Sequence, residues 1–400
     1  MSADHRPTTR REFLKIGAAG LAAGGLLQSC RPGNEQQPVQ NKQLSTHRTL
    51  GRTGLTLPVV SMGSIYAPEL IRAALDMGVA YIHTSPGYGE NNHELLLGRV
   101  FRDRDRDSFA VGTSPDLPYR NPRFGSRTMD LGLEVDPGRI SESMDESLRR
   151  LRLDHVDVFY LLSVGGREVT HEPYMEAFRK LKEEGKTRFV GIGTHQKEPE
   201  VIRAAVETGF WDIVLTSFNF RQSHREEVRA AIHEAAAEGL GVVAMKTQAG
   251  VYWDRARTRM INMKAALKWV LQDESVHTTI PAMATFEELE EDFSIMEDLS
   301  LTLEELSDLG LGERLGLSGL FCQQCRRCLD RCPSGFDIPT VMRAHMYATG
   351  HGQPFMARRL LESWTAADIG CHRCDRCAVE CSLGLDVRSS ALQVARFLDT

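Results

Sequence analysis

Between about Thr49 and Met296 the chain repeats one pattern eight times: a short apolar run, then an amphipathic stretch. Runs such as Val156–Leu162 are apolar almost throughout, which is typical of parallel strands covered on both faces. The pattern predicts strands at 59–62, 81–84, 109–113, 156–162, 189–193, 213–216, 241–246 and 278–281. It predicts helices at 69–77, 92–101, 139–151, 174–184, 199–207, 226–238, 261–273 and 285–296.

Eight such units predict an α/β protein with a (β/α)8 TIM barrel. A doubly wound sheet is the alternative, and a glycine-rich phosphate loop after the first strand would favour it. The segment Ser61–Tyr66 contains no G-x-G-x-x-G motif. We therefore expect the barrel over residues 47–300, followed by a connecting helix at 301–320.

Eight of the nine cysteines lie between Cys322 and Cys381, in two runs with the same C-x2-C-x2-C-x3-C spacing. This is the bacterial-ferredoxin spacing, in which the fourth cysteine of each run binds the other cluster. The spacing predicts that a first [4Fe–4S] cluster is bound by Cys322, Cys325, Cys328 and Cys381. It predicts that a second is bound by Cys371, Cys374, Cys377 and Cys332.

Two zinc sites are the alternative interpretation, but zinc would leave the third cysteine interval of each run redundant. The residues between the runs have helical character at 338–349 and 354–364, so we expect a small α-helical ferredoxin-like domain over 321–400. Several arginines lie among the ligands and either offset cluster charge or form only a solvated basic face. They are Arg326, Arg327, Arg331, Arg373 and Arg376.

Residues 1–30 have the features of an export signal. The stretch Thr9–Lys15 resembles a twin-arginine signal, and the apolar run 16–27 after it is too short to span a bilayer. An amphipathic first helix is the alternative, although its glycines disfavour it. Leu27–Cys30 resembles a lipobox with Cys30 as the lipidated residue; otherwise Cys30 is an incidental thiol. Residues 31–46 are polar and predict a flexible linker.

The twin-arginine route carries folded proteins, which suits a protein that receives its clusters in the cytoplasm. The predicted location is therefore the periplasm, either free or anchored in the membrane as a lipoprotein. The translocase is then a partner during export. The net charge of −6, with no basic stripe, argues against a nucleic-acid partner.

Several motifs in the middle of the chain resemble those of the aldo-keto reductase superfamily. They are Leu50–Leu55, Tyr81–Gly89, Glu94–Gly98, Gly191–His195 and Val243–Lys246. The first of them looks like the hairpin that plugs the barrel floor in that family. Ferredoxin-like tails occur in a recognised branch of aldo-keto reductase-like proteins, and the whole chain after residue 46 resembles that branch.

The resemblance implies a catalytic tetrad of Asp, Tyr, Lys and His, of which only the tyrosine is present. The four positions are occupied by His83, Tyr88, Ser114 and Ser163. An unperturbed tyrosine has a pKa of about 10, and without the lysine Tyr88 loses the main means of lowering it. His83 either replaces part of that function, by hydrogen bonding or by charge, or is simply polar. Tyr88 and His83 are the predicted catalytic residues.

The resemblance also implies nicotinamide-cofactor positions at Thr194, His195, Ser217 and Lys246. Between Pro281 and Asp292 there are five acidic residues and no arginine or lysine to pair with a 2′-phosphate. We therefore expect poor NADPH binding. The polar residues at the strand ends, Asn219 included, are expected to face one rim. They form either a site there or a degenerate set of loops. The segment 115–138 is expected to fold over that rim.

Three functions remain open. The first is an exported iron–sulfur oxidoreductase that acts on a small molecule and exchanges electrons with a partner protein or a membrane redox chain. The second is a non-catalytic electron-transfer or binding protein on an inactive barrel. The third is an NADPH-dependent aldehyde or ketone reductase.

Overall fold

The computed structural model describes residues 44–117, 133, 135–254, 256–317 and 319–399, which belong to one packed unit. The predicted signal at 1–30, the possible lipobox at Cys30 and nearly all of the linker lie outside these residues. So does most of the segment 115–138. Within the described ranges, no helix has both the length and the apolar character needed to cross a membrane.

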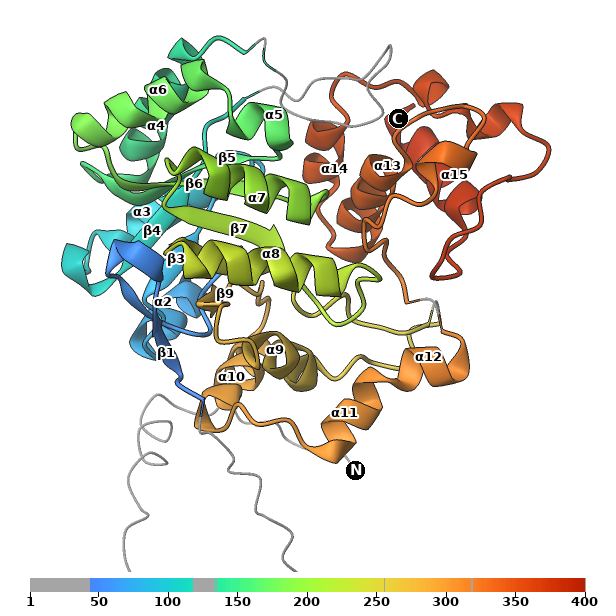
Figure 1. Ribbon diagram of the computed structural model, residues 1–400, viewed down its shortest axis with the longest axis horizontal. Coiled ribbons are helices and arrows are strands. Elements are labelled where there is room, and N and C mark those ends of the chain that lie inside the picture. Colours follow the sequence, from blue (N-terminus) through green and yellow to red (C-terminus); the bar gives the residue numbers. More distant parts are fainter. Residues whose placement is uncertain (1–43, 118–132, 134, 255, 318, 400) are drawn as a thin grey trace, which may run out of the picture. The chain divides into compact units, whose positions relative to one another are not determined.

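Seven parallel strands form one sheet in the order of the sequence (Figure 1). They are β3 (Tyr81–His83), β4 (Ala110–Thr113), β5 (Val156–Leu162), β6 (Thr187–Thr194), β7 (Ile213–Ser217), β8 (Gly241–Met245) and β9 (Thr278–Thr279). Parallel strands that neighbour one another in sequence order are the arrangement expected of a chain of βα units. Seven of the eight predicted strands are thereby confirmed, with β9 shorter than predicted.

The eighth predicted strand, 59–62, forms only isolated bridges. Val60 bridges Thr279 at one edge of the sheet, and Met62 bridges Ile82 at the other, both in parallel orientation. The backbone N–H of Met62 donates to the carbonyl of Tyr81 at 3.0 Å. The segment therefore connects the two edges, and the fold is TIM-barrel-like with seven regular strands.

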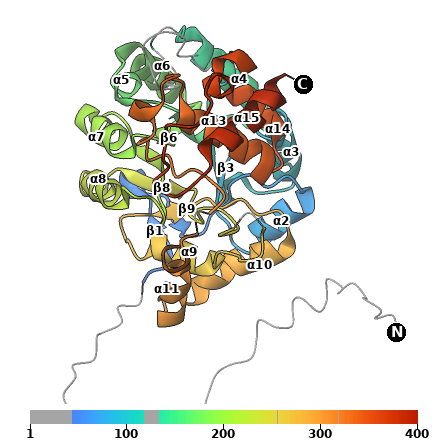
Figure 2. The same cartoon turned by 90° about the vertical axis from the view of Figure 1, so that its right-hand side faces the viewer.

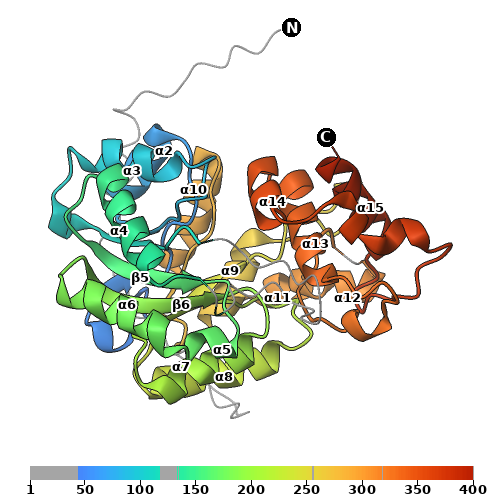
Figure 3. The same cartoon turned by 90° about the horizontal axis from the view of Figure 1, so that it is seen from above.

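Helices follow the strands and lie outside the sheet, as α6, α7 and α8 do beside β5 and β6 in Figure 3. All eight predicted barrel helices are present, with each end within two residues of its predicted position. They are α2 (Pro68–Asp76), α3 (His93–Phe101), α4 (Gly138–Leu151), α6 (Glu172–Glu183), α7 (Glu198–Thr208), α8 (Arg225–Ala237), α9 (Met263–Leu271) and α10 (Phe286–Ser294). A short helix that was not predicted, α5 (Gly166–Val169), precedes α6.

The predicted N-terminal hairpin is present: β1 (His47–Thr49) pairs antiparallel with β2 (Thr56–Pro58). Gly51, in the turn, has a φ of +49°, and a Cβ there would lie 2.4 Å from the backbone nitrogen of Gly241. Only glycine fits such a close approach. The hairpin therefore packs against the start of β8 and covers the amino end of the sheet.

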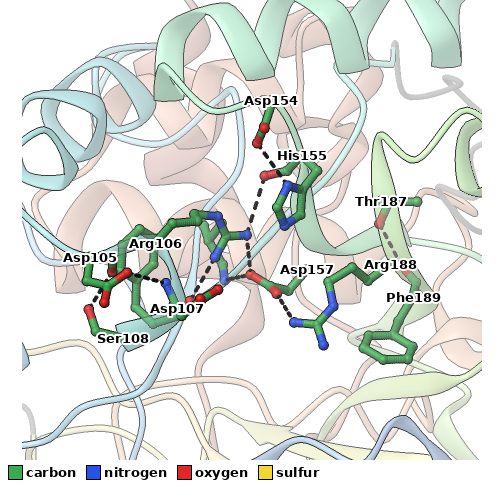
Figure 4. A network of polar contacts seen from close by, with 12 residues as sticks. Asp105, Arg106, Asp107, Ser108, Asp154, His155, Asp157, Thr187, Arg188 and Phe189 are labelled. Carbon is green, nitrogen blue, oxygen red and sulfur yellow. Dashed lines mark hydrogen bonds and ion pairs between the residues drawn. The ribbon is translucent and has the colours of Figure 1, made fainter.

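A buried carboxylate is held at the same end of the sheet, near the start of β5 (Figure 4). Asp157 is fully buried and accepts hydrogen bonds from Arg106 and Arg188, one on each carboxylate oxygen, at 2.7 Å. It also accepts from the backbone N–H of Val111 at 2.8 Å. Two cations and an amide thus offset the cost of removing this charge from water.

The C-terminal part of the chain is helical (Figure 2) and has its own apolar core. The predicted connecting helix is divided at Gly310 into α11 (Leu303–Leu309) and α12 (Leu311–Leu315). The helices that follow are α13 (Ile338–His345), extended by a π-helical turn, α14 (Pro354–Leu360) and α15 (Val387–Leu398). The first two confirm the predicted helices 338–349 and 354–364, whereas α15 was not predicted. The ferredoxin-like character of this region stays a prediction.

Candidate functional site

A cavity of about 740 Å³ lies at the carboxyl ends of the strands, where barrel proteins keep their sites. Its barrel-side lining includes His83, Tyr88, His195, Ser217, Asn219 and Lys246. Its other lining comes from beyond the barrel and includes Phe321, Cys322, Gln323, Arg343 and His351. The C-terminal region therefore forms part of the cavity wall.

His83, at the end of β3, is 2% exposed, and neither of its ring nitrogens has a hydrogen-bond partner among the described residues. Its ring packs edge-on against Tyr88 and Tyr160, with centroids 6.0 and 5.5 Å away. Burial, and next the charge of His93, lower the pKa of His83 to about 3. His83 is therefore neutral near pH 7. A neutral imidazole can act through hydrogen bonds rather than through charge, and whether His83 has a catalytic role or is simply polar stays a prediction.

His195, just after β6, is a second buried imidazole in the cavity wall. Its Nδ1 has no hydrogen-bond partner in the described part of the chain. Burial is the main cause that lowers the pKa of His195 well below its usual value, and the charges of Arg343 and Lys246 add to it. Two neutral imidazoles with unused nitrogens thus face one cavity.

Two cations meet near a tyrosine at the cavity edge. The Nζ of Lys246, directly after β8, lies 5.0 Å from the ring centroid of Tyr347. Arg343, on α13, is 5% exposed. Burial alone would raise the pKa of the Tyr347 hydroxyl, but the charges of Lys246 and Arg343, with a hydrogen bond from Lys246, lower it overall. This corner of the cavity is electropositive.

Acidic residues also line the cavity, namely Glu288, Glu291 and Asp292. Asp292 is buried and accepts a hydrogen bond from Gln248 Nε2 at 2.8 Å. Burial, followed by the charges of Glu291 and Glu288, raises the pKa of Asp292 to about 8. Glu288 and Glu291 are two of the five acidic residues from which the sequence predicts poor binding of a 2′-phosphate.

Three of the residues singled out from the sequence do not line the cavity. The Ser114 hydroxyl donates to Ser85 Oγ at 3.0 Å, and the Thr194 hydroxyl donates to the Gln196 carbonyl at 2.5 Å. Ser163 has a left-handed φ of 57°. The two serines at substituted tetrad positions are thus separate from the pocket that contains His83 and Tyr88.

The loop of the first cysteine run is attached to the barrel rim by side-chain hydrogen bonds. Asn219 Nδ2 donates to Gln323 Oε1 at 3.1 Å, and Arg326 Nη1 donates to Gln196 Oε1 at 2.8 Å. Sequence reasoning missed Gln323, although its place between two predicted ligands was a signal. It also missed Arg343, for which the sequence offers no signal, because α13 reaches the cavity only through the tertiary fold.

Thiols of one cysteine run act electrostatically on thiols of the other. Burial raises the pKa of Cys322, and repulsion from Cys328, Cys325 and Cys381 raises it further. In the same way burial raises the pKa of Cys371 to about 11, with contributions from the other run's Cys332 and from its own neighbours. All eight are free thiols. Within the described ranges, no three His, Cys, Asp or Glu side chains are placed to hold a single metal ion.

Residues 60–265, more than half of the chain, match the model of the aldo/keto reductase family. L-galactose dehydrogenase of Arabidopsis thaliana is 24% identical over 307 residues, covering 66% of this chain and 92% of that protein. Pyridoxal 4-dehydrogenase of Microbacterium luteolum is 26% identical over 241 residues, covering 50% and 69%.

A solved structure of an aldo-keto reductase from Bacillus halodurans, in its holo form, superposes with a TM-score of 0.53. It is 21% identical to this chain, of which it covers 66%, and 95% of that chain is matched. The likeness supports the fold, and the family match lies wholly within the barrel. The chain therefore belongs to the aldo/keto reductase family of oxidoreductases.

Proposed function

We propose that this protein is an exported oxidoreductase in which the cavity binds a small-molecule substrate and two [4Fe–4S] clusters carry the electrons. One observation carries the proposal: Cys322, from the first cysteine run, lines the same cavity as His83 and Tyr88. A predicted cluster ligand and the predicted catalytic residues thus line the same cavity.

The thiols fit the clusters. Cys381 acts electrostatically on the first run and Cys332 on the second, which is the crosswise ligand scheme of the spacing. Burial opposes ionisation of these thiols, so bound iron would stabilise the thiolates. Around a cube each thiolate binds a different iron, so the four sulfurs need not converge on one point. When bound, the clusters supply one-electron transfer.

The barrel residues supply the surroundings of the substrate. The neutral imidazoles of His83 and His195 can each donate or accept a hydrogen bond to a substrate oxygen. The Tyr88 hydroxyl is the proton donor in this proposal. Arg221 is 8% exposed, and burial lowers its pKa to about 10, an effect that Cys381 partly offsets. Arg221 is therefore a cation near Cys381 at neutral pH, and it offsets negative charge there.

Iron content tests the clusters. We expect anaerobically purified protein to contain about eight iron atoms and as much sulfide per chain, given two four-iron clusters. Cys381→Ser and Cys332→Ser should each disturb a different cluster in the electron paramagnetic resonance spectrum after reduction. Cys30→Ser, which lies outside both runs, is the control and should leave the iron content unchanged. Stoichiometric zinc in place of iron would contradict the proposal.

Substrate chemistry at the rim is tested separately. Tyr88→Phe and His83→Ala should abolish or slow cluster-linked turnover of a substrate. Unchanged turnover in both variants would instead favour a non-catalytic electron-transfer or binding protein on an inactive barrel. The iron content of both variants should equal that of the unmodified protein.

An NADPH-dependent aldehyde or ketone reductase is the second candidate, because the family is typically NADP-dependent. Against it, Glu288 and Glu291 line the cavity and would repel a 2′-phosphate. Fluorescence titration with NADPH separates the two candidates. Tight binding with carbonyl turnover would favour the reductase, and weak binding would favour electron delivery by an external protein or a membrane redox chain.

The location is part of the proposal and rests on the sequence alone. Replacing Arg10 and Arg11 by lysine should block export through the twin-arginine translocase. Cys30→Ser should release an exported lipoprotein from the membrane into the periplasm. A protein that reaches the periplasm with both arginines replaced would contradict this route.

A further inference from the structure

We propose that Lys246 and Arg343 form a subsite for the carboxylate of an organic acid at the edge of the cavity. The proposal deepens the function proposed above, since it concerns the same cavity and names the class of molecule that the cavity binds. One cation comes from the barrel and the other from α13, so the subsite exists only where the two parts of the chain meet.

The first argument is the charge that the protein leaves unbalanced. Arg343 is 5% exposed, and its Nε has no hydrogen-bond partner among the described residues. Within the same residues, no carboxylate forms an ion pair with Arg343 or Lys246. A buried guanidinium without a counter-charge is costly, and a ligand carboxylate would remove that cost with a fork-shaped pair of hydrogen bonds.

The second argument is the set of neutral polar groups beside the cations. His195 is close enough to Arg343 and Lys246 for their charges to affect its pKa. The unused nitrogens of His83 and His195 suit hydroxyl or carbonyl oxygens. A molecule with one carboxylate and further oxygen groups would therefore satisfy both the cations and the imidazoles. We infer a small hydroxy acid or oxo acid.

The third argument is size and the remaining charge. A cavity of about 740 Å³ is in the ordinary range for a small-molecule site. Glu288 and Glu291 line it as well and would repel a second anionic group. A monoanionic acid therefore fits better than a ligand with several phosphates.

Two matched pairs of probes test the subsite by calorimetry on full-length protein with its measured iron content. D-gluconate is compared with sorbitol, and L-lactate with L-lactamide, so that each pair differs mainly in the negative charge. We expect at least one acid to bind about tenfold more tightly than its neutral partner. Lys246→Met and Arg343→Met should each remove most of that preference without weakening the neutral probe.

The controls separate charge from folding. Arg396→Met removes a cation from the exposed face of α15 and should change nothing. Arg343→Lys keeps the charge and should keep part of the preference. The proposal is overturned if neither acid is preferred, or if both Met variants keep the preference while only the reduction potential changes, since the cations would then serve a cluster. If protein that contains no iron still binds the acid more tightly than its neutral partner, the result would contradict the proposed clusters but support the subsite.

Discussion

The two ends of the sheet differ in whether their buried polar groups have hydrogen-bond partners. At the amino end, Asp157 is fully buried, and both of its carboxylate oxygens accept from arginines (Figure 4). At the carboxyl end, His83 and Arg343 are almost as deeply buried, yet nitrogens of both have no partner among the described residues. A polar group that the fold satisfies contributes to stability, whereas one that it leaves unsatisfied costs stability and is available to a ligand.

The largest effect is expected at the amino end. Asp157→Ala leaves two arginines without their partner and should lower the free energy of unfolding by about 3–5 kcal/mol. Urea titration at pH 7 measures it. Asp154→Ala is the control, because the Asp154 side chain is 90% exposed and its pair with His155 is expected to contribute little. If Asp157→Ala lowers the free energy of unfolding by less than about 1 kcal/mol, the satisfied carboxylate at the amino end does not contribute the stability expected of it.

The next effect is expected at the carboxyl end and has the opposite sign. The pKa of Asp292 is about 8 in the folded protein, and about 3.9 is usual for an unfolded chain. The folded state therefore holds a proton that the unfolded state releases, and stability falls as pH rises from about 4 to about 8. Asp292→Asn removes this loss.

Asp292→Asn should raise the free energy of unfolding at pH 7 by about 4 kcal/mol and change it by less than about 1 kcal/mol at pH 4. The asparagine can still accept the hydrogen bond from Gln248. Urea titrations at the two pH values measure the difference. An equal effect at both would mean that ionisation of Asp292 is not its cause.

The same contrast explains what the sequence could predict. Every barrel helix was located because apolar residues recur with a helical period, and β5 was located because Val156–Leu162 is an unbroken apolar run. His83 and Tyr88 were located because the stretch Tyr81–Gly89 resembles a motif of the aldo-keto reductase superfamily. These signals lie within short stretches of sequence, and the helices and strands that they predict are present in the structure.

The features that the sequence predicted wrongly or missed depend on contacts between distant segments. The segment 59–62 was predicted to be a strand, but its partners Thr279 and Ile82 pair with it at single residues only. Arg343 lies on a helix that was located correctly, yet nothing in α13 indicates that it reaches a cavity formed by β3 and β8. Ser114 and Ser163 directly follow β4 and β5, but they are not among the residues that line the cavity.

A smaller effect is expected at His83 and depends on pH. The pKa of His83 is about 3 in the folded protein, against about 6.5 in an unfolded chain. Between those values the unfolded state binds the extra proton, so stability falls as pH falls. His83→Leu removes this penalty. The free energy of unfolding of the variant, relative to that of the unmodified protein, should therefore rise by about 2 kcal/mol as the pH falls from 7 to 5. Parallel stability curves for the two proteins would contradict it.

The smallest effect is expected where the two parts of the chain meet. Arg326 donates a hydrogen bond to Gln196 at 2.8 Å, and Arg327 beside it is exposed. Arg326→Ala should lower the free energy of unfolding by about 0.5–1.5 kcal/mol, the usual net contribution of one hydrogen bond, and Arg327→Ala should not. Both variants remove one positive charge from the same loop, so any electrostatic effect on the neighbouring cysteines is matched. A difference between them in urea titration therefore measures the contact itself, and equal losses would mean that the loop's charge, not its attachment to the barrel rim, stabilises this junction.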